Sequence, residues 1–114
     1  MKKLSILFLL ALPFVLQFCA HSKKMTAKVP PKMTYMANVQ PTMVANCTPC
    51  HFPPRGNKKA YDNYAAVTKD IDQIISRIQK NPSDKGFMPF KHSKLSDSTI
   101  TVFVQWKTDG LLEK

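Results

Sequence analysis

Hydrophobic residues occur in this chain as one N-terminal run followed by several stripes of helical spacing. Residues 4–16 are apolar except for Ser5 and Pro13. Farther along, apolar residues recur every three or four positions, the period of an α-helix, and no stretch shows the alternation of a β-strand. The expected helices cover residues 39–47, about 60–67, 70–80 and from Asp97 to a stop at Gly110. The pattern predicts one small all-α domain without internal repeats.

Prolines and capping residues mark where these helices begin and end. Pro41 lies in the first turn of the first expected helix, where a missing backbone N–H does no harm. Pro82 closes the third helix, and Ser96 is a suitable N-cap for the last one. The apolar stripe of the third helix is Ile71, Ile74, Ile75 and Ile78. The last helix carries Ile100, Phe103, Val104 and Trp106.

The N-terminal run has the organisation of a secretory signal. Lys2 and Lys3 precede it, and small or polar residues follow it. The run is short for a transmembrane helix, which needs roughly 17 to 25 apolar residues. The lysine-rich segment that follows contains Pro30 and Pro31 and has too few large apolar residues to fold alone, although packing onto the domain remains the alternative. We expect a signal peptide at 1–19, a flexible basic tether at 20–34 and the folded domain at 35–114.

Cys19 stands at the end of the apolar run, after Leu16, Gln17 and Phe18. This segment resembles a bacterial lipobox, in which the cysteine is lipidated and becomes the new N-terminus. Phe18 occupies the place that usually holds a small residue. The alternative is ordinary signal cleavage a residue or two later, which would discard Cys19. Lipidation is favoured because it accounts for a single unpaired cysteine at this position.

The other two cysteines form a motif with the histidine that follows them, Cys47-Thr48-Pro49-Cys50-His51. The C-x-x-C-H spacing is typical of covalent c-type haem attachment. Two thiols at this separation can add to the two vinyl groups on one side of the porphyrin, and the adjacent histidine then lies beneath the iron. The motif therefore predicts one covalently bound haem.

Two other interpretations of the cysteine pair were weighed against haem attachment. A thioredoxin-like dithiol follows a strand in a chain of alternating strands and helices, a pattern that is not evident here. A structural zinc site needs about four thiolate or imidazole ligands. Beyond Cys47, Cys50 and His51, only His92 is left in the body of the domain. Haem attachment is favoured over both.

The chain resembles the monohaem cytochrome c family, class I-like, over about residues 36–112. The features shared in the family's order are the helix leading into Cys47-Thr48-Pro49-Cys50-His51, a proline-rich turn, short middle helices, Gly86-Phe87-Met88-Pro89-Phe90 and a closing helix that ends in Trp106-Lys107-Thr108-Asp109-Gly110. The resemblance implies a small helical domain wrapped around one haem c. It also implies His51 as the proximal and Met88 as the distal iron ligand, with a middle segment that is short for the family.

The residues around Met88 favour the same distal ligand. Gly86 and Pro89 predict an irregular loop rather than a helix, which suits a segment that crosses a haem face. The neighbouring Phe87 and Phe90 are expected to keep water from the iron. A buried core thioether is the alternative role for Met88. The other candidate ligands are Met36, Met43 and His92.

Further residues are candidates for the surroundings of the haem. The backbone carbonyl of Pro53 or Pro54 is expected to accept a hydrogen bond from His51 Nδ1. Exposed basic residues are usually just solvated, yet four of them are candidates to face the haem propionates, namely Arg55, Lys58, Lys59 and Lys91. Three aromatic residues are expected either to border the haem or to pack between helices, namely Tyr61, Tyr64 and Trp106.

The charge of the chain bears on its partner. The chain has 17 Lys and Arg residues against 7 Asp and Glu residues, a net charge of +10, and without Lys2 and Lys3 it is still +8. Nucleic acid is a poor fit for an exported chain. Lysines near a haem edge would steer an acidic redox partner, such as a terminal oxidase or a quinol-oxidising complex. The alternative is attraction of the tether to anionic lipid.

The sequence thus predicts an electron carrier rather than an enzyme. It is expected to be exported to the periplasm or cell envelope, at the outer face of a bacterial membrane. A histidine and a thioether fill both axial positions, which favours electron transfer and raises the potential relative to two histidines. The alternatives are a haem enzyme subunit or a small-ligand sensor with a displaceable sixth ligand, and a non-catalytic subunit of a larger redox complex.

Overall fold

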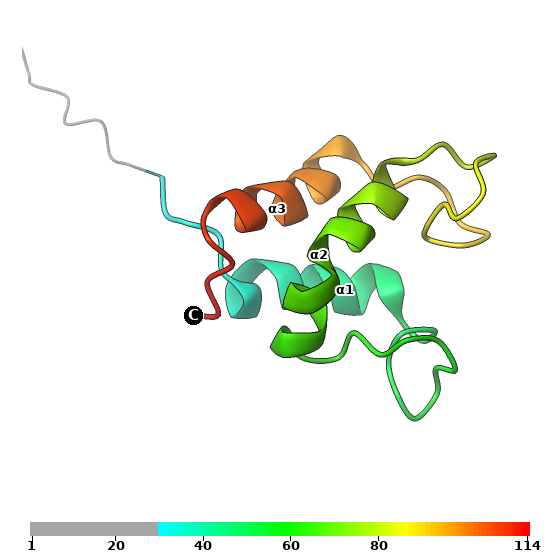
Figure 1. Cartoon of the computed structure of the whole chain (residues 1–114), viewed down its shortest axis with the longest axis horizontal. Coiled ribbons are helices and arrows are strands. Elements are labelled where there is room, and N and C mark those ends of the chain that lie inside the picture. The colour runs from blue at the N-terminus through cyan, green and yellow to red at the C-terminus, as the bar shows by residue number, and fades with distance from the viewer. Residues whose placement is uncertain (1–29) are drawn as a thin grey trace, which may run out of the picture. The chain divides into compact units, whose positions relative to one another are not determined.

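The computed structural model describes residues 30–114. The expected signal peptide, Cys19 and most of the expected tether lie outside these residues. The described part forms a π-helical turn η1 (Tyr35–Val39), followed by α1 (Gln40–Cys47), α2 (Tyr64–Gln79) and α3 (Asp97–Thr108) (Figure 1). It contains no strand, so the all-α class is confirmed for this part of the chain. None of its helices is long and apolar enough to cross a bilayer.

Helix α2 corrects the expectation of two separate helices over 60–67 and 70–80. It begins at Tyr64, because the Asn63 side chain caps it by accepting a hydrogen bond from the Ala66 N–H at 3.0 Å. Residues 60–63 therefore lie before the helix. The polar pair Thr68 and Lys69 does not interrupt it. Its buried stripe continues across that pair and comprises Val67, Ile71, Ile74 and Ile78.

The first and last helices begin where their sequence signals place them. Pro41 lies in the first turn of α1, although the preceding π-helical turn was not predicted. The Ser96 hydroxyl caps α3 by accepting a hydrogen bond from the Thr99 N–H at 3.2 Å. After α3 ends, Gly110 adopts a φ of +100°, a left-handed conformation that glycine tolerates best. The predicted start and stop of the last helix are confirmed.

One end of the domain is closed by aromatic side chains and by the C-terminal residues. The rings of Tyr35, Tyr64 and Trp106 pack with centroids 5.6 to 6.2 Å apart. The Leu112 carbonyl accepts hydrogen bonds from the Tyr35 N–H and the Trp106 Nε1–H, both at 2.8 Å. The Tyr64 hydroxyl donates to the Leu111 carbonyl at 2.8 Å. We call this region, the three aromatic residues with 110–113, the packed end.

The opposite end consists of the two long connections, residues 48–63 and 80–96. Figure 1 shows both of them on the side of the helices that faces away from the C-terminus. We call these two connections the loop end. The core runs between the two ends, and its most fully buried large side chains are Trp106, Phe103, Met43, Val39 and Val67. Met43 therefore belongs to the core, as its place in the first expected helix indicated.

Candidate functional site

The C-x-x-C-H motif begins on the last residue of α1 and continues as a tight turn. Cys47 ends the helix, and Thr48 is already extended. The His51 N–H donates a hydrogen bond to the Cys47 carbonyl, and the Phe52 N–H donates to the Pro49 carbonyl, both at 3.1 Å. The helix thus positions the first cysteine, and the turn brings the histidine back beneath the helix end.

Gly56 packs directly against this turn. A Cβ atom on Gly56 would lie 2.5 Å from the Pro49 carbonyl oxygen and closer still to that of Cys50. The Gly56 N–H donates to the Phe52 carbonyl at 3.0 Å, which holds the chain at this close approach. Any side chain here would push the motif backbone away. The sequence analysis did not single out Gly56, although a glycine within a turn-rich loop is the signal that could have found it.

The orientation of His51 is fixed by a carbonyl that the sequence did not indicate. His51 Nδ1 lies 2.6 Å from the Lys59 carbonyl oxygen. The expectation of Pro53 or Pro54 as the acceptor is wrong, because residues 52–58 turn back and bring residue 59 to the ring instead. A carbonyl only accepts, so Nδ1 carries a proton, and whenever the ring is neutral the lone pair is on Nε2. This is the tautomer that an Nε2 metal ligand requires.

Tyr61 supports the same histidine from one face. Its ring stacks on the His51 imidazole with centroids 4.9 Å apart and an interplanar angle of 24°. The Tyr61 N–H also donates to the His51 carbonyl at 2.9 Å. Of the three aromatic residues expected at the haem or between helices, Tyr61 lies at the motif, whereas Tyr64 and Trp106 pack at the other end of the domain.

Both cysteines of the motif are free thiols, and they differ in exposure. Cys47 is partly buried and its Sγ donates to Met43 Sδ at 3.7 Å, whereas Cys50 is exposed. Burial raises the pKa of the Cys47 thiol to about 11. A redox dithiol needs a thiol whose pKa is lowered, so this environment disfavours that alternative.

Met88 lies in the connection between α2 and α3 and is tied to the end of α2. Its N–H donates to the Arg77 carbonyl at 3.2 Å, and its side chain is partly buried against the core. The preceding Phe87 is buried. Phe90 was expected to shield the iron together with Phe87, but it is 67% exposed, with the Lys91 ammonium 5.4 Å from its ring centroid. Only Phe87 can play the expected part.

A cavity of about 410 Å³ is lined by residues from the end of α1 and from the connection between α2 and α3, but not by Cys47, Cys50, His51 or Met88 themselves. Its lining includes Thr48 of the motif and Pro89 and His92 of the connection between α2 and α3. This volume is within the range of small-molecule and cofactor sites. Residues 41 positions apart along the chain, from Thr48 to Pro89, therefore face one space.

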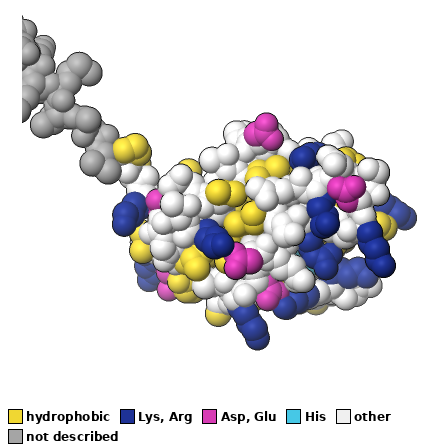
Figure 2. Space-filling model, turned by 45° about the horizontal axis from the view of Figure 1, so that its top comes forward, with side chains coloured by type: hydrophobic (Ala, Val, Ile, Leu, Met, Phe, Trp, Pro, Cys, Tyr) yellow, Lys and Arg dark blue, Asp and Glu magenta, His cyan; other side chains and the backbone are white. Residues whose placement is uncertain are grey.

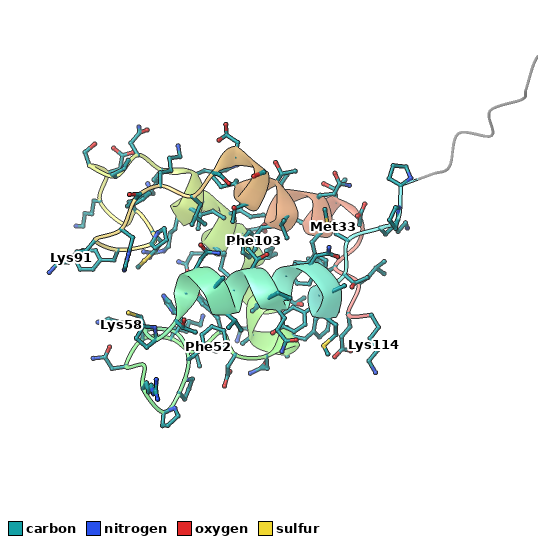
Figure 3. The ribbon with its side chains drawn as sticks, turned by 180° about the vertical axis from the view of Figure 1, so that it is seen from behind. Met33, Phe52, Lys58, Lys91, Phe103 and Lys114 are labelled. Carbon is teal, nitrogen blue, oxygen red and sulfur yellow. The ribbon has the colours of Figure 1, made fainter. Side chains whose placement is uncertain are left out.

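The four basic residues expected near the haem propionates are all exposed, and one of them is paired with an acidic side chain. Lys59 forms an ion pair with Asp70 while its side chain is 57% exposed, and its place near a haem propionate stays a prediction. The hydrogen bond from Lys59 lowers the pKa of the Asp70 carboxyl. Arg55, Lys58 and Lys91 are exposed. Figure 2 shows Lys and Arg side chains gathered toward the loop end, and Figure 3 places Lys58 and Lys91 at that end.

Among residues 30–114, no three His, Cys, Asp or Glu side chains lie together as a metal site, so the zinc interpretation finds no ligand cluster there. Comparison of the chain with models of protein families, with curated proteins and with solved structures found no match.

Proposed function

We propose that this chain is an electron-transfer protein that carries one haem c. Cys47 and Cys50 would hold the haem through thioether bonds, and His51 and Met88 would be its axial ligands. The observation that carries the proposal is the His51 ring, whose Nδ1–H is committed to the Lys59 carbonyl and whose Nε2 is free. This imidazole follows directly on two free thiols at haem-attachment spacing.

The surrounding residues fit such a group. Gly56 lets the chain pass close to the motif, and Thr48 shares a cavity with Pro89, the neighbour of Met88. A bound haem would supply the exchange of one electron between ferric and ferrous iron. The role of the chain is to orient His51 through the hydrogen bond at Nδ1 and to offer a soft, neutral thioether from Met88. A thioether ligand favours the reduced state of the iron.

The exposed basic residues support a partner with an acidic docking surface. Arg55, Lys58 and Lys91 lie on the same connections as the proposed ligands. Charges placed around a reaction site raise the rate of encounter with an oppositely charged partner, and salt weakens this effect. We therefore propose a redox protein as partner, in the periplasm or cell envelope, with lipidation of Cys19 as the attachment to the membrane.

Mass spectrometry of the denatured protein tests the attachment. The full chain, expressed in a bacterium with a haem-attachment system, should retain the mass of one haem after denaturation. Cys50→Ser should lose one thioether bond, and Cys47→Ser with Cys50→Ser should release the haem entirely. Haem that is fully extractable from the wild type, or a bound zinc ion in its place, would contradict the proposal.

The visible spectrum tests Met88 as the distal ligand. Met88→Ala should remove the weak long-wavelength band of a methionine-iron bond, admit carbon monoxide and lower the potential, because the thioether is lost. His92→Ala is the matched control and should leave all three unchanged. Rapid binding of carbon monoxide by the wild type would instead favour a sensor or an enzyme subunit, and a spectrum altered only by His92→Ala would transfer the distal role to His92.

A further inference from the structure

A carboxylate on α2 holds the chain segment that orients His51. Asp70 lies in the first half of α2, and its side chain is 11% exposed. Its Oδ2 atom accepts a hydrogen bond from the Tyr61 hydroxyl at 3.0 Å and pairs with the Lys59 ammonium. A single carboxylate oxygen therefore contacts both Lys59 and Tyr61, the residues on either side of Ala60.

These same two residues make the contacts that hold the histidine. The Lys59 carbonyl accepts the Nδ1–H of His51 at 2.6 Å. Tyr61 covers one face of the ring at 4.9 Å and donates its N–H to the His51 carbonyl at 2.9 Å. The segment 59–61 thus contacts His51 at three places: at Nδ1, on one face of the ring and at the backbone carbonyl.

Helix α2 is packed into the core and can therefore hold this segment in place. Val67 is fully buried, and Ile71, the immediate neighbour of Asp70, is also part of the core. Residues 59–61 belong to no helix of their own, so their position depends on the contacts they make. The charge-assisted contact with Lys59 and the hydrogen bond from Tyr61 both lead to the same carboxylate, which makes Asp70 the connection between the core and the histidine.

We propose that Asp70 is a positioning residue that acts through Lys59 and Tyr61 to hold the His51 imidazole in one orientation, with Nδ1–H donated and Nε2 free. The consequence for electron transfer rests on the proposed function, since the orientation of a ligating ring tunes the iron only if His51 binds it. Without the negative charge, the Lys59 ammonium loses its ion pair and the hydrogen bond from the Tyr61 hydroxyl is weakened. The segment then opens more often, and the Nδ1–H exchanges with water.

Asp70→Asn removes the charge and keeps the shape of the side chain. Asp72→Asn is the matched control, because Asp72 is an aspartate of the same helix that pairs with Lys107 of α3 instead. The full chain, expressed with a haem-attachment system and labelled with ¹⁵N at histidine and at the backbone, is examined by NMR in the reduced state. We expect the His51 Nδ1–H to exchange at least about tenfold faster in Asp70→Asn than in the wild type, the effect of losing a hydrogen bond to a charged group. Asp72→Asn should match the wild type.

The backbone N–H of buried Val67 separates positioning from general stability. If Asp70 positions the ring, the exchange of Val67 should change much less than that of His51. Equal acceleration at both sites, or no acceleration at His51, overturns the proposal. The mass of the same samples tests the haem separately. A wild-type chain without covalent haem ends the proposed function, while the exchange comparison on that chain still decides whether Asp70 holds the imidazole.

Discussion

The two ends of this domain are held together by different kinds of contact. At the packed end, Tyr35 and Trp106 are almost completely buried, and the Tyr35 backbone N–H and the Trp106 indole N–H both donate to the Leu112 carbonyl. At the loop end, backbone hydrogen bonds between residues close in sequence shape the turns, and Tyr61 and Phe87 are the aromatic side chains that are buried. The proposed site lies in the less densely packed part, on a scaffold that the other part stabilises. Stability and chemistry should therefore respond to different substitutions.

The largest effect is expected from emptying the packed end. Trp106 is 0% exposed, so Trp106→Ala leaves a large cavity and also removes one of the two donors to the Leu112 carbonyl. Truncation of a buried tryptophan costs about 3–5 kcal/mol. The free energy of unfolding, measured with urea, should fall by that amount. Val104→Ala on the same helix, where the side chain is 38% exposed, should change it by less than about 0.5 kcal/mol. Similar losses for both variants would contradict the comparison.

The next effect comes from adding one methyl group at a glycine of each end. Gly56→Ala forces the methyl group into the Pro49 and Cys50 carbonyls, and overpacking of this kind costs about 1–3 kcal/mol. Gly110→Ala meets no atom within 4 Å and costs about 1 kcal/mol because of its positive φ. Mass spectrometry should show a lower yield of haem-bearing chains for Gly56→Ala only. Equal yields would place the motif outside the influence of Gly56.

A smaller effect is expected at the start of α2. Asn63→Ala removes the side chain that accepts the Ala66 N–H, and the loss of an N-cap costs about 1 kcal/mol. Helix α2 spans the domain, so thermal unfolding monitored by circular dichroism should detect the loss for the whole protein. Asn57→Ala, an exposed asparagine of the same connection, should leave the transition in place. A shift of equal size for Asn57→Ala would argue against the cap.

The smallest effect is expected from acid at Asp109, the residue that precedes the packed end in the sequence. The Met33 N–H and the Gln105 amide both donate to the Asp109 carboxylate and lower its pKa below that of the unfolded chain, about 3.9. The stabilisation that these hydrogen bonds give the folded state is present above about pH 4 and is lost as the pH falls through the lower pKa of Asp109 in the folded state. Asp109→Asn should remove this part of the acid dependence of the urea midpoint. An identical pH profile for both proteins would contradict the assignment.

Local sequence signals predicted some of these elements well. Ser96 marks the start of α3 because a cap acts on a residue three positions away, and Gly110 marks its end for a similarly local reason. The prediction of two separate middle helices was wrong, because the polar residues Thr68 and Lys69 suggest a break between them. The helix continues through these two residues because Val67 and Ile71 on either side are buried in the core.

The surroundings of the motif depended on contacts that spacing does not reveal. C-x-x-C-H and Met88 were identified from residue types and order alone, and their roles remain predictions. The acceptor for His51 was misassigned to a proline because the return of Lys59 to the ring is a property of the folded loop. Asp70 was missed for the same reason, since an acidic residue on a helix surface carries no sign that it meets Lys59 and Tyr61.

The hydrogen bond from Tyr35 to Leu112 makes the backbone of the domain almost a closed ring. Chains whose ends meet can be circularly permuted, joined by a short linker where the ends touch and opened at an exposed turn elsewhere. Opening at the exposed Ser83 would place Met88 ahead of Cys47 in the new sequence and would keep every contact within the helices. A permuted chain would therefore test whether these residues come together in space when their order in the sequence is reversed.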